Sequence, residues 1–205
     1  MSANWYGKVG NYNDVTFPPD GDWDKRLTGI GCLKLVPVET LQQNPWFSLR
    51  TRGGYFTTEY HLPQVAVLPV LNGNSVVMVR VKRPVINDMT LELPAGGVER
   101  NEDPVVAASR ELGEEVGIII TDMSRFVPMP PIAISSTRMP NLSYVFKIDI
   151  SEQEFVDRRP HDHEIHSVER FVFGEIAAMM KSGKIYVSLS LAILGIFLVS
   201  SNKEN

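Results

Sequence analysis

The chain has 205 residues and a single cysteine, and its 20 Lys and Arg against 24 Asp and Glu give a formal net charge of −4. This length allows one large domain or two small ones that fold without a disulfide or structural metal. A hydrophobic content of 43% excludes a mainly disordered chain, and slight acidity without a basic block argues against nucleic-acid binding through net charge. Because Cys32 cannot form an internal disulfide, we expect a cytoplasmic protein.

Residues 1–63 are predicted to form a small β-rich N-terminal subdomain, followed by a second domain over residues 64–205. An apolar run at Gly31–Val36 indicates a strand. Two further strands are predicted at Phe47–Thr51 and Tyr55–Tyr60, because the Arg-Gly-Gly sequence between them is typical of a hairpin turn.

A second hairpin is predicted at the start of the larger domain. Its strands are Val65–Leu71 and Ser75–Val81, and the Asn-Gly-Asn sequence between them is a strong turn signal. Both strands are nearly continuous in apolar residues, so we expect both of their faces to be covered. After a short strand at Leu91–Leu93, Pro94–Gly97 indicates a tight glycine loop.

The next element is a helix whose ends are marked by three residues. Asp103 suits the N-cap, Pro104 the first helical position, and Gly117 the position just past the last turn. This order of strands and helices indicates an α/β fold in which a mixed β-sheet is sandwiched between helices. The remaining predicted elements are strands at Ser143–Ile150 and Val168–Phe173, and helices at Glu175–Lys181 and Ser188–Ser200.

The most apolar stretch of the chain is Ile185–Val199. Two serines and a glycine interrupt it, and it is shorter than the roughly 20 apolar residues of a spanning helix. We therefore interpret it as a buried or dimer-facing helix and expect no membrane association. The polar Met1–Asn13 lacks the apolar segment of a secretory signal.

Three carboxylates project together from the helix that begins near Pro104. At 100° per residue, Glu111, Glu114 and Glu115 lie within about 100° of one another, beside the apolar flank that packs on the sheet. Like charges at these spacings repel, so a bare cluster is a poor device for solubility. The cluster indicates either a site for a hard divalent cation or a solvated acidic face.

A wider pattern surrounds these carboxylates. It reads G-x5-E-x7-R-E-U-x-E-E-x-G-U, where U is aliphatic, and the chain matches it at every specified position. This pattern resembles the Nudix box, the loop–helix–loop signature of the Nudix hydrolases. The matching positions are Gly96, Glu102, Arg110, Glu111, Leu112, Glu114, Glu115, Gly117 and Ile118.

The resemblance implies a Nudix fold over residues 64–205 and a role for each box residue. Members of the family use Mg²⁺ or Mn²⁺ to hydrolyse a pyrophosphate in a nucleoside diphosphate linked to another group. By analogy, metal ligands would come from Glu111 and Glu115, assisted by Glu114 and by the backbone carbonyl of Ala95. By the same analogy, Arg110 would orient the glutamates, and Glu102 would tie the loop to the helix.

Flanking segments are similar to the ADP-ribose pyrophosphatase branch over roughly residues 45–200. In that branch the arginine at the position of Arg83 contacts substrate, and the glycine loop with Gly96 and Gly97 lies at the substrate. Glu92, a carboxylate in an apolar strand, either contacts substrate or pairs with Arg83. The branch also forms homodimers in which the N-terminal subdomain of one subunit contributes to the other's site.

Candidate residues for that contribution lie in the predicted N-terminal hairpin. The resemblance implies an aromatic side chain that stacks on adenine, with Phe56, Tyr55 or Trp46 available. Arg50 or Arg52 could contact phosphate.

Two later segments complete the predicted site. Residues 129–137 lack the Ser-Pro-Gly-like context that ADP-ribose hydrolases usually carry after the box. In the branch a mobile acidic loop supplies the catalytic base, and Glu164 is the matching candidate. Alternatively, the nearby His161, His163 and His166 could bind a transition metal or be simply exposed.

Together these features predict metal-dependent hydrolysis of a nucleoside diphosphate sugar, with ADP-ribose as the first candidate and AMP and ribose 5-phosphate as its products. The alternatives are another Nudix substrate, such as GDP-mannose or a dinucleoside polyphosphate, and a non-catalytic ligand sensor. The intact box and the lack of a basic DNA-binding segment argue against the sensor.

Overall fold

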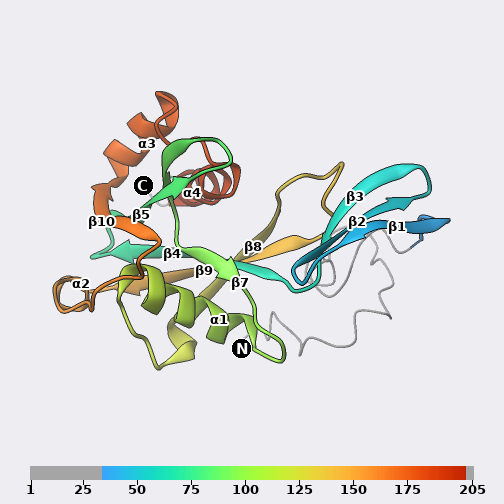
Figure 1. Ribbon diagram of the computed structural model, residues 1–205. Coiled ribbons are helices and arrows are strands. Elements are labelled where there is room, and N and C mark those ends of the chain that lie inside the picture. Colours follow the sequence, from blue (N-terminus) through green and yellow to red (C-terminus); the bar gives the residue numbers. More distant parts are fainter. Residues whose placement is uncertain (1–33, 202–205) are drawn as a thin grey trace.

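The computed structural model describes residues 34–201, and its strands form two separate sheets (Figure 1). The predicted strand at Gly31–Val36 begins outside the described residues, and its described part forms a turn and a bend instead. Cys32 and Met1–Asn13 also lie outside the described residues.

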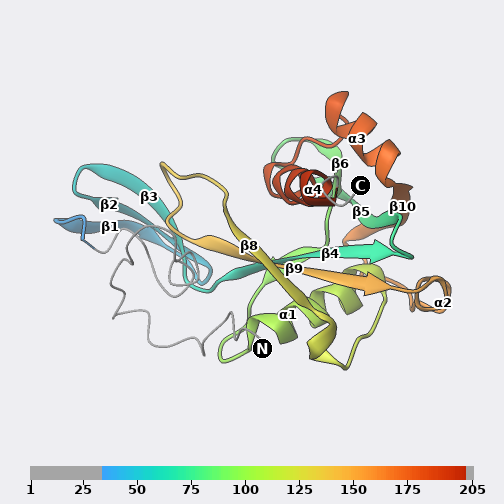
Figure 2. The same cartoon turned by 180° about the vertical axis from the view of Figure 1, so that it is seen from behind.

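The first sheet has three antiparallel strands, β1 (Val38–Gln43), β2 (Phe47–Arg52) and β3 (Tyr55–Tyr60). The predicted hairpin between β2 and β3 is confirmed. Its turn contains Gly53 and Gly54 with φ of +53° and +87°, a region that glycine occupies without the steric cost met by other residues. This small sheet projects to one side of the main body of the molecule (Figures 1 and 2).

The second sheet has seven strands and is mixed, with the central order β10-β5-β4-β9-β8. Strands β4 and β9 are parallel, and the other pairs are antiparallel. The predicted β4–β5 hairpin is confirmed. The strands are β4 (Gln64–Leu71), β5 (Ser75–Arg83), β6 (Asp88–Glu92), β7 (Ala95–Gly97), β8 (Val127–Ala133), β9 (Leu142–Ile150) and β10 (Ile165–Val172).

Strands β4 and β5 separate soon after their turn, and the chain between β6 and β7 crosses this gap. The two strands pair directly only at Val70–Val76 and Leu71–Ser75. Farther along, β5 pairs with β6 while β4 pairs with β7. The predicted glycine loop is therefore partly a short strand, because the backbone of Ala95–Gly97 pairs with the open edge of β4. This arrangement places the glycine segment in the middle of the sheet.

Helices cover the two faces of the large sheet, as the predicted sandwich requires (Figures 1 and 2). Alternate residues of β4 enter opposite cores: Val65 and Val67 pack with α1, whereas Ala66 and Leu68 pack with α3 and α4. The helices are α1 (Pro104–Glu111), the π-helical turn η2 (Leu112–Val116), the 3-10 turn η3 (Met123–Arg125), α2 (Glu152–Val156), α3 (Phe173–Lys181) and α4 (Ser188–Ser201).

The two sheets are joined through the loop between β8 and β9. The Asn141 side chain pairs with the backbone of Tyr60 as a neighbouring strand would. Its oxygen accepts from the Tyr60 N–H at 3.0 Å, and its NH₂ donates to the Tyr60 carbonyl at 3.3 Å. Thr58 N–H donates to the Arg138 carbonyl at 2.8 Å. Strand β8 lies at the sheet edge, where its prolines interrupt the pairing register between Met129 and Ile132.

The apolar stretch near the C-terminus forms α4. Its Ile193 and Leu194 are fully buried, whereas Val199 is 64% exposed. Within residues 34–201, no helix is long and apolar enough to cross a membrane.

Candidate functional site

The site is built on α1 and η2, whose two ends are fixed by the predicted residues. Asp103 accepts a hydrogen bond from Val105 N–H and caps α1, with Pro104 at the first position. Gly117 ends η2 with φ of +82°, and a Cβ there would lie 2.0 Å from the Arg159 carbonyl oxygen. Only glycine allows the chain before β10 to approach so closely. The helix continues past Glu111 as a π-helical turn, which the sequence did not predict.

Arg110 holds the acidic side chains around the glycine segment. Its guanidinium makes two hydrogen bonds to Glu102, both of 3.0 Å, and one of 2.7 Å to the Gly97 carbonyl. It also donates to Glu111 at 2.8 Å and to Glu114 at 3.1 Å. Glu102 in turn accepts from the backbone at residue 99. Arg110 thus connects the loop before α1 to the carboxylates on the helix.

Glu111 and Glu115 lie against the glycine segment itself. Glu115 accepts a hydrogen bond of 2.9 Å from Ala95 N–H. A Cβ on Gly96 would be 2.1 Å from the Glu111 carboxylate oxygen Oε1, so this carboxylate needs the space that glycine leaves. The sheet and the helix therefore meet where two carboxylates contact the backbone of residues 95 and 96.

The surroundings of both carboxylates disfavour their charged forms. Burial raises the pKa of Glu115 to about 8; the Ala95 hydrogen bond lowers it, and the charge of Glu111 raises it further. Burial also raises the pKa of Glu111, although Arg110 opposes this shift. Since burial favours the neutral carboxylic acid, nearby positive charge would favour the ionised form of each carboxylate.

Arg83 approaches the same place from the end of β5. It forms a bidentate ion pair with Glu92 on β6, with distances of 2.8 and 2.9 Å, and Thr90 also donates to Glu92. The Arg83 side chain stays 44% exposed. Hydrogen bonding to Glu92 raises the pKa of Arg83 above its usual value, burial lowers it, and the charges of Glu92, Glu115 and Glu164 add to the rise. Arg83 thus stands within electrostatic reach of both Glu115 and Glu164.

The segment before β10 is attached to the end of η2 by its backbone. Asp162 N–H donates to the Glu114 carbonyl at 2.7 Å, and Arg159 N–H donates to the Gly117 carbonyl at 2.9 Å. Glu164, the predicted base, is exposed on this segment. Among the histidines, His161 bonds the Asp162 carbonyl and His163 pairs with the Asp162 carboxylate.

Comparison with known proteins identifies the segment that carries this site. The model of the NUDIX domain matches residues 60–189, which is more than half of the chain. The chain belongs to the Nudix family. The predicted Nudix fold is confirmed by this match and by similarity to the crystal structure of an ADP compounds hydrolase, with a TM-score of 0.64 over 83% of this chain and 95% of that one. That structure is 14% identical in sequence.

Curated relatives match shorter parts of the Nudix domain. A methanol dehydrogenase activator of Bacillus methanolicus is 46% identical over 57 residues, which are 28% of this chain and 31% of that protein. An ADP-ribose pyrophosphatase of Bacillus subtilis (strain 168) is 33% identical over 104 residues, or 47% and 56% of the two chains. An ADP-sugar pyrophosphatase of Mus musculus is 44% identical over 57 residues, 26% of each. The chain thus spans about a quarter to just over half of these relatives' lengths.

The Nudix box brings together oxygen atoms, which are the ligands that a hard divalent cation prefers. Glu111 and Glu115 bring oxygens to the backbone at Ala95, and both carboxylates have raised pKa values because they are buried. Within residues 34–201, however, no group of three or more His, Cys, Asp or Glu is arranged to hold a metal ion. Glu111 and Glu114 accept hydrogen bonds from Arg110, whereas Glu115 accepts one from Ala95 N–H.

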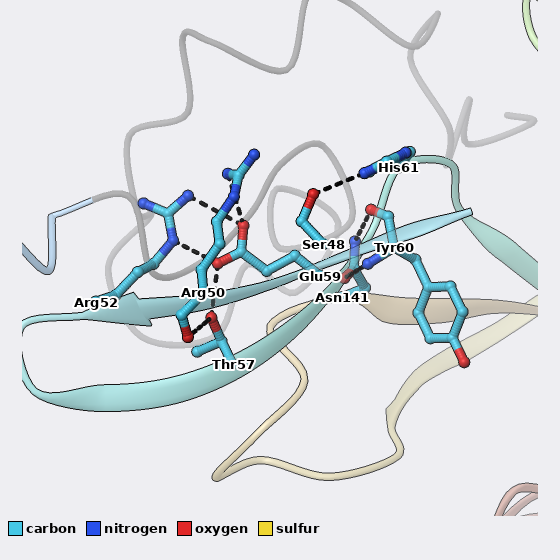
Figure 3. A network of polar contacts seen from close by, with 8 residues as sticks. All are labelled: Ser48, Arg50, Arg52, Thr57, Glu59, Tyr60, His61 and Asn141. Carbon is cyan, nitrogen blue, oxygen red and sulfur yellow. Dashed lines mark hydrogen bonds and ion pairs between the residues drawn. The ribbon is translucent and has the colours of Figure 1, made fainter. Parts of the chain in front are cut away.

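The predicted N-terminal contributors lie on the projecting small sheet, apart from the Nudix box. Trp46, Tyr55 and Phe56 are 57–71% exposed. Arg52 is only 4% exposed, and its guanidinium is held by Glu59 at 2.5 and 3.0 Å (Figure 3). Arg50 also pairs with Glu59 at 3.0 Å, but its side chain is 26% exposed and is the more accessible of the two arginines.

Sequence reasoning missed two supporting residues of the Nudix site. Thr90 holds Glu92 from two residues away on the same strand, a spacing that places both side chains on one face. Ser190 on α4 accepts from Leu93 N–H, just before the glycine segment. The strand period could have revealed Thr90, but nothing in the sequence links Ser190 to a residue 97 positions away.

Proposed function

We propose that this Nudix protein hydrolyses the pyrophosphate bond of a nucleoside diphosphate sugar with the help of Mg²⁺ or Mn²⁺. The observation that carries the proposal is the pair of buried carboxylates, Glu111 and Glu115, packed against the backbone of residues 95 and 96. Burial raises the pKa of both, so a nearby dication would favour their ionised forms.

Each residue of the site has a distinct task in this proposal. Glu111, Glu115 and the Ala95 carbonyl would hold the metal, with Glu114 assisting. Glu111 and Glu114 would give up their contacts with Arg110 to do so. When bound there, the metal would supply positive charge to the diphosphate and lower the pKa of the attacking water. Arg83, fixed by Glu92, would bind a phosphate oxygen, and the open space beside Gly97 would leave room for the diphosphate. Glu164, on the exposed segment, would accept the proton of the attacking water.

ADP-ribose is the first substrate to test, with AMP and ribose 5-phosphate as products. Two of the curated relatives bear the names ADP-ribose pyrophosphatase and ADP-sugar pyrophosphatase. A second candidate is another nucleoside diphosphate derivative, such as GDP-mannose or a dinucleoside polyphosphate. It is favoured by β8, where prolines interrupt the pairing after Met129 in the segment that differs from the usual ADP-ribose hydrolase pattern.

We also propose that residues 1–63 form a dimerising subdomain and residues 64–205 the hydrolase domain of a cytoplasmic homodimer. The small sheet projects away from its own Nudix box (Figure 1), so Phe56 and its exposed neighbours could reach the site of a second copy. Light scattering after gel filtration tests the dimer. Mixing Phe56→Ala with Glu115→Gln tests sharing, because mixed dimers would regain one intact site.

The substrate is tested by incubating the protein and Mg²⁺ with a panel of nucleotides. The panel contains ADP-ribose, GDP-mannose, UDP-glucose, diadenosine polyphosphates, NADH and nucleoside triphosphates, and products are separated by chromatography. We expect a nucleoside diphosphate sugar to be preferred, and a preference for a triphosphate would overturn this substrate class.

The matched variant for this panel is Glu115→Gln. It keeps an oxygen for the Ala95 N–H and replaces a carboxyl group whose charged form burial disfavours, so folding should stay near wild type or improve. Hydrolysis should fall below a tenth of the wild-type rate, a barrier increase of more than about 1.4 kcal/mol. A variant that retains more than a tenth shows that Glu115 is not a principal metal ligand.

A further inference from the structure

Ser190 makes a buried contact between the C-terminal helix and the strand that leads to the Nudix box. It lies in the first turn of α4 and is 3% exposed. Its Oγ accepts a hydrogen bond of 2.9 Å from the backbone N–H of Leu93, which is itself only 2% exposed. A buried N–H that loses its partner is costly, so this contact strongly constrains the backbone at Leu93.

The segment around Ser190 contacts β6 at both of its ends. Tyr186 O–H donates to the Asp88 carboxylate at 2.6 Å where β6 begins, and Ser190 accepts from Leu93 where it ends. Between these contacts, Leu91 and Leu93 share a buried core with Ile193 of α4. In Figure 2, α4 and β6 lie next to each other. The start of α4 therefore determines where β6 ends.

The backbone after Leu93 is held at each successive residue. The Pro94 carbonyl accepts from Val67 N–H at 2.8 Å, and Ala95 N–H donates to Glu115 at 2.9 Å. Pro94 has no N–H of its own, so Leu93 is the last donor before Ala95. Three consecutive hydrogen bonds thus connect α4, the sheet and the Glu115 carboxylate.

We propose that Ser190 is a positioning residue for the hydrolysis proposed above: by fixing Leu93, it sets the place of Ala95 and so the orientation of the Glu115 carboxylate. The inference rests on the proposed function. Ser190 touches neither substrate nor metal, and it acts through the backbone of residues 93–95. Its loss should therefore affect the rate and metal binding more than substrate affinity.

The test compares Ser190→Ala with two matched variants. Ser190→Thr keeps the hydroxyl, and Ser188→Ala removes an exposed hydroxyl two residues earlier on the same helix. For each we would measure kcat and KM on the best panel substrate, Mn²⁺ affinity by electron paramagnetic resonance, and exchange of the Leu93 and Ala95 amide protons by NMR. All measurements are made well below the midpoint of thermal unfolding.

For Ser190→Ala we expect exchange at both amides to become at least tenfold faster. We further expect kcat to fall at least fivefold, Mn²⁺ to bind at least threefold more weakly, and KM to stay within twofold. Ser190→Thr should return kcat and Mn²⁺ affinity to within twofold of wild type, and Ser188→Ala should match wild type.

Two results would overturn the proposal. One is a Ser190→Ala protein with unchanged Mn²⁺ affinity and unchanged protection at Ala95. The other is a loss of kcat that only parallels a loss of folded protein, which shows a purely structural role. Failure of the proposed function can be told apart from failure of this inference. If the wild-type protein hydrolyses no panel member, amide exchange and Mn²⁺ affinity still measure whether Ser190 positions Ala95 and Glu115.

Discussion

The small sheet and the Nudix helix both bury carboxylates, but they surround them differently. Glu59 on β3 is 1% exposed and accepts hydrogen bonds from Arg52, Arg50 and Thr57 (Figure 3). Burial alone raises the pKa of Glu59, but the hydrogen bonds from Arg52 and Thr57 and the charges of both arginines hold that pKa below its ordinary value.

Glu115 is buried with far less compensation. Burial raises its pKa to about 8, it accepts a hydrogen bond from the backbone N–H of Ala95, and the neighbouring Glu111 charge raises the pKa further. A buried carboxylate with several cationic and hydrogen-bonding partners is typical of a structural ion pair. A buried carboxylate with few such partners and a raised pKa is a candidate for binding a cationic ligand. On the proposed function, this difference separates a structural cluster from a candidate functional one.

The largest effect is expected from breaking the compensated cluster with Glu59→Gln. This change removes the ion pair between Glu59 and Arg52, whose side chains are 2% and 5% exposed. Breaking a buried ion pair by removing one partner is strongly destabilising, and we expect the free energy of unfolding to fall by about 3 kcal/mol. Chemical denaturation followed by circular dichroism measures the change.

The control for this prediction is Glu39→Gln, which alters an exposed glutamate on β1 of the same sheet. It should change the free energy of unfolding by less than about 0.5 kcal/mol. If the two variants are equally stable, the Arg52–Glu59 pair does not hold the small sheet together.

The same comparison shows why only part of the fold could be predicted. The β4–β5 hairpin, the α1 cap at Asp103 and the left-handed Gly117 follow from local turn and capping chemistry. The pairing of Ala95–Gly97 as a strand depends instead on the edge that β4 leaves open after diverging from β5. Tertiary pairing of this kind has no local signal.

Likewise, part of the candidate site could be predicted from the sequence and part could not. The box pattern predicted how Arg110 and the three helix glutamates lie relative to one another, because fixed spacing on one helix fixes their relative directions. It did not predict that Arg52 is buried in an ion pair with Glu59, because that pair joins β2 to β3 across the turn. Nor could it predict Ser190, which meets Leu93 only through the packing of α4.

The pH dependence of stability should separate the two clusters in the metal-free protein. Glu115 has a raised pKa when folded, so the folded state binds more protons between about pH 4.5 and 8. Stability should therefore rise as the pH falls through this window, by at most about 1.4 kcal/mol per pH unit. Glu59 has a lowered pKa, so its contribution is present above about pH 4.5 and is lost in stronger acid.

Urea unfolding at several pH values, with and without Mg²⁺, measures these slopes. The slope between pH 5 and 8 should weaken in Glu115→Gln, and it should also weaken in wild type when Mg²⁺ binds the ionised carboxylates. An unchanged slope in Glu115→Gln would show that another group takes up the proton.

The smallest effect is expected from Glu114→Gln. This variant tests whether the more buried glutamates of the Nudix helix contribute more to hydrolysis. The Glu114 side chain is 51% exposed and pairs with Arg110 at 3.1 Å, a surface contact worth less than about 0.5 kcal/mol. We therefore expect near wild-type stability and a two- to fivefold loss of kcat, against at least tenfold for Glu115→Gln. If steady-state kinetics instead show equal losses, the metal draws equally on buried and exposed carboxylates. Burial of Glu115 would then affect the folded protein but would not decide which glutamate dominates hydrolysis.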